Sequence, residues 1–174
     1  LVLDTRLNPV LPRNAVYLRV GIDGVRPEGR STYGRTRADT RAYIGLIGAS
    51  VLAVRARVEA ASAPQPAFLQ PWLGGSASLR GLSPGEFAGD QLLAFSAEVR
   101  VPFSSPLSVG TLGVALFADV GAVGAHADPV SALAFERSVG AGVFLALPVV
   151  SINLDVAHAM GRGTRLHVAT GVRF

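Results

Sequence analysis

Few side chains in this sequence have the types and spacing that catalysis or metal binding requires. Cysteine is absent, and the three histidines, His126, His158 and His167, show no metal-ligand spacing. The stretch LGGSASLRG contains serines but lacks the spacing of a nucleophile elbow. Asp119 could pair with His126 or His158, yet nothing supplies the third group of a catalytic triad. We therefore predict no enzyme active site, no metal and no cofactor.

A single arginine in an unusual segment is the remaining candidate. Arg80 lies in the middle of GGSASLRGLSPGEFAGD, residues 74–90, which is glycine-rich, mostly polar and too long for a hairpin turn. A guanidinium can donate a fork of hydrogen bonds to carboxylates. In an exposed loop, the same side chain would simply be solvated. Whether Arg80 pairs with carboxylates or is solvated therefore depends on the elements that surround this segment.

Composition limits the class of protein. The chain has 174 residues, enough for one domain, and its net charge of +4 comes with sixteen arginines and no lysine. These basic residues are scattered without interleaved aromatics, so we predict no nucleic-acid partner. Mean hydropathy is high for a soluble domain, but no run of about 18 apolar residues could form a transmembrane helix. The charged start, Leu1–Arg6, is not a signal peptide.

Alternation of apolar and polar residues is the dominant pattern. In VSINLDVAH, residues 150–158, every second residue is apolar, and in LLAFSAEVRVPF, residues 92–103, Glu98 opposes Val99 and Val101. Side chains alternate between the two faces of a strand, so this pattern predicts strands with one apolar and one polar face. Nine strands are predicted, at 1–7, 14–25, 32–44, 50–61, 90–102, 109–121, 134–147, 150–159 and 165–174.

The connections between these strands differ at the two ends of the predicted sheet. Outer-membrane barrels have short periplasmic turns and longer extracellular loops. In an up-and-down sheet, both long connections, 62–89 and 122–133, fall at the same end. The connections at one end are 8–13, 45–49, 103–108 and 148–149, and those at the other are 26–31, 62–89, 122–133 and 160–164.

This asymmetry, the hydropathy and the terminal Phe174 favour an apolar face directed toward lipid over a soluble, lipocalin-like barrel, in which the apolar face points inward. Because single-chain bacterial barrels normally have even strand numbers, nine strands suggest the C-terminal portion of a larger barrel. A closed eight-stranded barrel is the alternative.

Five segments, in this order, resemble a known family. The similarity is to the C-terminal barrel region of the outer-membrane protein assembly factors, the BamA/TamA-like bacterial surface antigen superfamily, and it runs from Leu3 to Phe174. The segments are LDTRLNPVLPRN (3–14), LGGSASLRGL (73–82), SAEVRVPF (96–103), FADVGAV (117–123) and SVGAGVFLALPVVSINLDVAH (138–158).

The resemblance implies a position for the long segment. In that family the corresponding loop folds back into the barrel lumen, and its arginine contacts acidic and aromatic groups of the inner wall. The alternation independently places the wall residues on one face of their strands, which would point inward. The matching residues are Arg80, Gly81 and Leu82 in the loop 62–89, and Glu98, Phe117 and Asp119 in the wall.

The resemblance also implies a function. It predicts a single β-barrel domain, 1–174, in the bacterial outer membrane that inserts, assembles or translocates proteins without catalysis. The expected partners are the lipid bilayer, unfolded or nascent outer-membrane or secreted proteins, and accessory periplasmic proteins. Phe174 resembles the terminal aromatic insertion signal of such barrels and could equally be a lipid anchor. A passive small barrel, pore or membrane anchor and a soluble ligand-binding barrel are the alternatives.

Overall fold

A computed structural model of the chain describes residues 1–26, 28, 31–105 and 109–171. Strands account for most of these residues. Helical structure in this part of the chain is confined to two short 3-10 turns, η1 (Ala67–Leu69) and η3 (Val130–Ala132). Within the same residues, no helix is long and apolar enough to cross a membrane.

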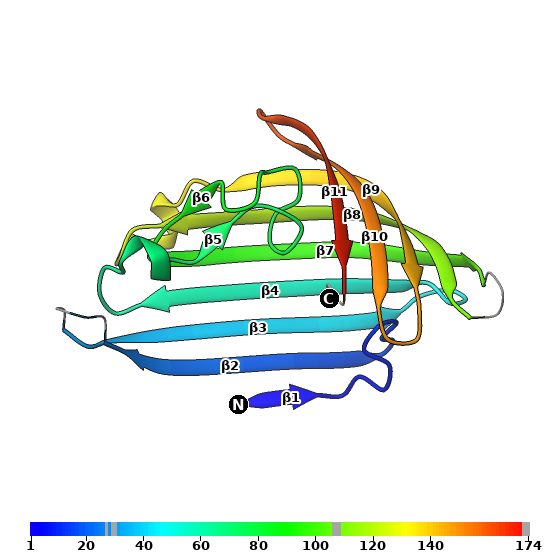
Figure 1. Cartoon of the computed structure of the whole chain (residues 1–174), viewed down its shortest axis with the longest axis horizontal. Coiled ribbons are helices and arrows are strands. Elements are labelled where there is room, and N and C mark those ends of the chain that lie inside the picture. The colour runs from blue at the N-terminus through cyan, green and yellow to red at the C-terminus, as the bar shows by residue number, and fades with distance from the viewer. Residues whose placement is uncertain (27, 29–30, 106–108, 172–174) are drawn as a thin grey trace.

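One curved antiparallel sheet dominates the fold, and its strands follow one another in chain order (Figure 1). The final strands, β10 and β11, curl over the sheet, so that the sheet has a concave inner face and a convex outer face. The strands of this sheet are β1 (Val2–Asp4), β2 (Ala15–Val25), β3 (Tyr33–Gly45), β4 (Val51–Ala61), β7 (Gln91–Ser104), β8 (Thr111–Gly124), β9 (Glu136–Ala146), β10 (Ser151–Ala159) and β11 (Gly163–Thr170).

The predicted all-β, up-and-down order is confirmed, and each predicted strand corresponds to a strand of this sheet. The alternative of eight strands is wrong for the described residues, in which the large sheet has nine strands. The first strand ends at Asp4 rather than at residue 7, because the Asp4 carboxylate accepts hydrogen bonds from the backbone and side chain of Arg6 and turns the chain. Two further strands, β5 (Trp72–Leu73) and β6 (Phe87–Ala88), pair with each other inside the long loop.

The expected closure of the sheet into a barrel is not seen in the described residues. β1 pairs with β2 and β11 with β10, and the two remain at opposite edges of the sheet. Both edges therefore keep backbone groups that can pair with another strand. Residues 172–174, which include the proposed terminal signal Phe174, lie outside the described residues.

The two faces of the sheet have opposite chemistry. The outer face carries exposed apolar side chains; Leu116 is 64% exposed, Val156 50% and Leu166 64%. The inner face carries all but one of the charged side chains of the described strands, and Glu98 and Asp119 are among those that are buried. A soluble lipocalin-like barrel would have the reverse arrangement, with its apolar face buried and its charged face in water.

Two segments cover the inner face. The loop 62–89 lies against β7 and β8, where β5 and β6 contact these strands (Figure 1). At the other end of the sheet, Val10 in the β1–β2 connection packs with Ala115, Phe144 and Ala146. The polar inner face is therefore filled with protein along much of its length.

Candidate functional site

The candidate site lies on the inner face of β7 and β8, beneath the loop 62–89. Glu98 and Phe117 are direct cross-strand partners in the register of these strands, and Asp119 is paired with Ser96. Because residues two apart in a strand share a face, Phe117 and Asp119 point to the same side as Glu98. The strands thus present an aromatic ring between two carboxylates.

Arg80 of the loop lies directly on this surface. Its Nε and Nη2 atoms each donate a hydrogen bond of 2.8 Å to one of the two carboxylate oxygens of Asp119. Its backbone N–H donates to the same side chain at 3.1 Å, and Nη1 donates to Glu98 Oε2 at 2.5 Å. The paired bonds to Asp119 fix the plane of the guanidinium as well as its position, which a point charge could not do.

The ring of Phe117 lies against the same guanidinium. The Arg80 Cζ atom is 3.4 Å from the ring centroid, within the range of a cation–π contact. The ring in turn lies over Gly140 of β9, where a Cβ atom would collide with its edge. Glycine at this position therefore lets Phe117 lie flat between the strand and Arg80.

The site is buried and rich in charge. The side chains of Arg80 and Glu98 are each 3% exposed, and that of Asp119 is 1% exposed. Arg100 also donates to Glu98, from Nε to Oε1 at 2.7 Å, and Asp155 Oδ2 lies 3.7 Å from Arg80 Nη1. Unpaired charges in such a place are costly, so each group depends on its partners for stability.

Gly81 connects the loop to the last strand of the sheet. Its backbone N–H donates a hydrogen bond of 2.8 Å to Nε2 of His167 in β11. Gly81 has a φ of +93°, and a Cβ atom there would lie 2.9 Å from the backbone nitrogen of Ala159. Only glycine tolerates both the left-handed backbone and this close approach.

Apolar packing holds the loop on both sides of Arg80. Leu79 and Leu82 are completely buried, together with Leu73 of β5 and Leu92 of β7. Leu82, one of the predicted loop residues, is buried in this cluster. Burial of a leucine side chain typically contributes about 1.5–3 kcal/mol, so the cluster and the ion pairs together oppose release of the loop.

A further contact reaches the loop from β4. Arg55 donates a hydrogen bond of 3.0 Å from Nη1 to the carbonyl oxygen of Ala77. The same guanidinium is held by Asp39, at 3.0 Å and 2.9 Å from its Nε and Nη2 atoms. The segment 77–81 is therefore held from strands in the middle of the sheet and from edge strand β11.

The structure brings four of the six candidate residues into direct contact, with Arg80 on Glu98, Phe117 and Asp119. Gly81 instead contacts β10 and β11, and Leu82 lies in the leucine cluster. The structure does not bring together the Asp–His pairs considered for catalysis, since Asp119 is bound by Arg80 and His158 lies beside Thr164 on the other face. Among the described residues, no group of acidic, histidine and cysteine side chains could hold a metal ion.

Among the contributors that sequence reasoning missed are Arg100, Asp155 and His167. Their alternation with apolar neighbours places each on the inner face, but nothing in sequence spacing indicates that β10 and β11 curl far enough to reach the loop. The contacts with Asp155 and His167 follow from the curvature of the sheet (Figure 1).

Comparison with known proteins identifies the family of this chain. No curated protein matches this chain. The Omp85 superfamily domain matches residues 1–174, which is the whole chain, and this superfamily is associated in general with insertion or translocation of proteins at the outer membrane. The match agrees with the antiparallel all-β fold. The chain belongs to the Omp85 superfamily.

Proposed function

We propose that this chain forms a membrane-spanning wall in the bacterial outer membrane that takes part in the insertion or translocation of other proteins. Residues 1–174 act as one barrel-type domain, and the loop 62–89 braces its inner face. The proposal is supported by membership of the Omp85 superfamily and by the distribution of charge on the sheet.

The main support for this proposal is that charged side chains lie on one face of the sheet and apolar side chains on the other. Along β2–β11, the charged strand residues lie on the inner face with a single exception, Arg137, among the residues that the structure describes. Transmembrane barrels have an apolar outer band and a polar interior. Exposure of such a wide apolar surface to water would be unfavourable, whereas acyl chains would cover it without cost.

The loop gives the wall a rigid inner support. Arg80 joins β7 and β8 through their carboxylates, and Gly81 joins the same loop to edge strand β11. In the proposed mechanism this support keeps β11 in position while its free edge pairs with a strand of the client protein. Strand addition at an open edge uses backbone hydrogen bonds, so it can accept many different client sequences. No nucleotide or catalytic group is needed, because folding of the client provides the free energy.

Two measurements test the proposal. Heat-dependent gel mobility after detergent extraction tests for a membrane barrel, since such barrels migrate differently when folded and unfolded. Client insertion into liposomes that contain the full-length protein then tests the function. We expect Arg80→Ala to retain folded mobility and lose most client insertion, while Arg162→Ala, which removes an exposed arginine that contacts the same loop at Glu86, keeps both.

Different outcomes separate the alternatives. Full extraction without detergent and no heat-dependent mobility would contradict a membrane location. A membrane barrel whose insertion activity is the same with and without Arg80 would favour the passive barrel, pore or anchor. Loss of folded mobility in Arg80→Ala would be resolved by Arg80→Lys, which keeps the charge and should retain the fold while losing the paired bonds to Asp119.

A further inference from the structure

The outer face of the sheet carries one charged strand residue, Arg137. The registers of β2 to β11 place it on the same face as Val139 and Val120, and no other arginine, aspartate or glutamate of the described strands projects there. It is the second residue of β9, at the end of the sheet that holds the long loops. Its side chain is exposed and forms no hydrogen bond or ion pair with any described residue.

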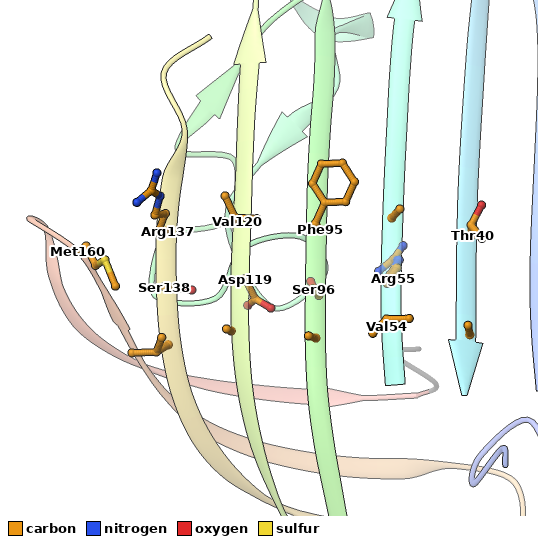
Figure 2. Close-up of a pocket in the computed structure, with 15 residues that line it drawn as sticks. Thr40, Val54, Arg55, Phe95, Ser96, Asp119, Val120, Arg137, Ser138 and Met160 are labelled. Atoms are coloured by element: carbon orange, nitrogen blue, oxygen red, sulfur yellow. The ribbon is translucent and has the colours of Figure 1, made fainter. Parts of the chain in front are cut away.

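A groove with a volume of about 670 Å³ lies beside Arg137 on the same face (Figure 2). Two neighbouring cross-strand rows form most of it, and small side chains make the second row lower than the first. The higher row consists of Thr40, Ala56, Phe95, Val120 and Arg137, and the lower row of Ala42, Val54, Ala97, Ala118 and Val139. Figure 2 shows Phe95, Val120 and Arg137 at one level across β7, β8 and β9, with Met160 at the end of the groove.

The dimensions of the groove suit a flexible chain better than a helix. Residues on one face of a strand are spaced by two residues, roughly 7 Å, so a trough one row wide has about this width. A helix with its side chains is about 10–12 Å across, so it would rest on the higher row of side chains and could not enter the trough. A client strand would need unpaired backbone groups to bind here. Because β7, β8 and β9 are each paired with neighbouring strands on both sides, the groove offers none.

The positive charge of Arg137 at the end of the groove indicates that the ligand has an anionic headgroup. An arginine on the lipid face costs about 2–4 kcal/mol at the bilayer midplane and about 0–1 kcal/mol near the interface. Arg137 is near the end of its strand, where a phosphate headgroup could accept its guanidinium hydrogen bonds. The apolar trough begins at the same point, beside Val139.

We propose that the outer face binds one anionic phospholipid, with its phosphate on Arg137 and one acyl chain in the trough over Ala97 and Ala118. The inference rests on the proposed membrane location of this face. It adds a specific lipid site to a wall that would otherwise contact lipids without preference.

Native mass spectrometry of the full-length protein tests this site. The protein is reconstituted in nanodiscs of equal amounts of phosphatidylglycerol and phosphatidylcholine with the same acyl chains, and the lipids retained after release are counted. We expect wild type to retain phosphatidylglycerol preferentially. Arg137→Gln should lower that preference about fivefold, because one basic residue near a charged membrane surface contributes about 1 kcal/mol.

Two variants make the test specific. Arg26→Gln removes an exposed arginine just after β2, at the same end of the sheet, and should leave the preference unchanged. Ala97→Leu combined with Ala118→Leu fills the trough without touching the inner face, and should reduce retention of both lipids. Equal retention by wild type and Arg137→Gln would overturn the lipid site, as would no headgroup preference in wild type.

The remaining outcomes are also decisive. A dimer that the double leucine variant abolishes would assign the groove to a second copy of the chain and overturn the lipid. Heat-dependent gel mobility is measured on the same samples. A protein that inserts but shows no lipid preference overturns this site alone, whereas a protein that fails to insert overturns both this site and the proposed membrane location.

Discussion

Replacement of Arg80 by alanine should release the loop from the inner face while the sheet stays folded. The side chain is 3% exposed and is held by two carboxylates and a ring. Removal leaves the Asp119 side chain, 1% exposed, without its paired donors. Removal of one partner from a buried ion pair typically costs about 3–5 kcal/mol. Because the strands pair through their backbones, this cost falls on loop docking rather than on the sheet.

Hydrogen–deuterium exchange of the amides of residues 74–82 measures that cost directly. When exchange follows local opening, each 1.4 kcal/mol lost accelerates it tenfold, so Arg80→Ala should speed exchange by roughly two to three and a half orders of magnitude. Amides of β7 and β8 should change little by comparison. Trp72 is the one tryptophan of the sequence and lies within the loop, so its fluorescence gives a second, independent signal.

Two further variants test whether the paired bonds of Arg80, rather than its charge alone, hold the loop. Arg80→Lys keeps a positive charge but cannot make paired bonds to Asp119, so it should restore only part of the protection. Arg162→Ala removes exposed ion pairs with Glu86 and Glu136 and should change exchange a few-fold at most. Acceleration of exchange by less than tenfold in Arg80→Ala, or full protection in Arg80→Lys, would contradict loop docking through the paired bonds of Arg80.

Three other changes test neighbouring parts of the site. Gly81→Val should speed exchange of the loop at least as much as Arg80→Ala, since valine resists a φ of +93°; unchanged exchange would contradict the close contact. Gly140→Val should displace the ring of Phe117. The ring-current shifts that this ring causes in the NMR signals of neighbouring residues should then disappear, and client insertion should fall. The backbone N–H of Ser83 holds the pKa of Glu86 below its ordinary value, so this stabilisation is present above the ordinary pKa and disappears as the pH falls through the lowered value. The melting temperatures of wild type and Glu86→Gln should therefore differ at neutral pH and converge in acid.

The strands could be predicted from sequence because each has one face of uniform chemistry. Ser151–Ala159 alternates without interruption, and its inner residues are buried while its outer residues are exposed. Even Tyr33–Gly45, whose apolar face is poor, forms a strand, because its inner arginines pair with acidic groups such as Asp23 and Asp39. The two-residue strands β5 and β6 could not be predicted, since two residues are too short for any alternation.

The candidate site was only partly accessible from the sequence. The alternation of Glu98 and Asp119 with apolar neighbours places both on the polar face of their strands, and the resemblance supplies Arg80 as the partner. The contributions of Asp155 and His167 depend on how far the sheet curls, which no local pattern specifies. Alternation likewise does not say which face is concave; the position of the loop determines that.

The orientation of the sheet in the bilayer is the claim on which the rest depends. The sequence has no cysteine, so single cysteines can be introduced one at a time along residues 151–156 of β10 and spin-labelled. In reconstituted bilayers, the collision rate of each label with oxygen, which is enriched among acyl chains, is compared with that of a water-soluble nickel complex.

We expect accessibility to oxygen to alternate with a period of two residues. Labels at 152, 154 and 156, where the native side chains are exposed, should collide mainly with oxygen, and labels at 151, 153 and 155 should be protected from it. The opposite phase, or equal access of the nickel complex at all six positions, would contradict an outer face that meets lipid.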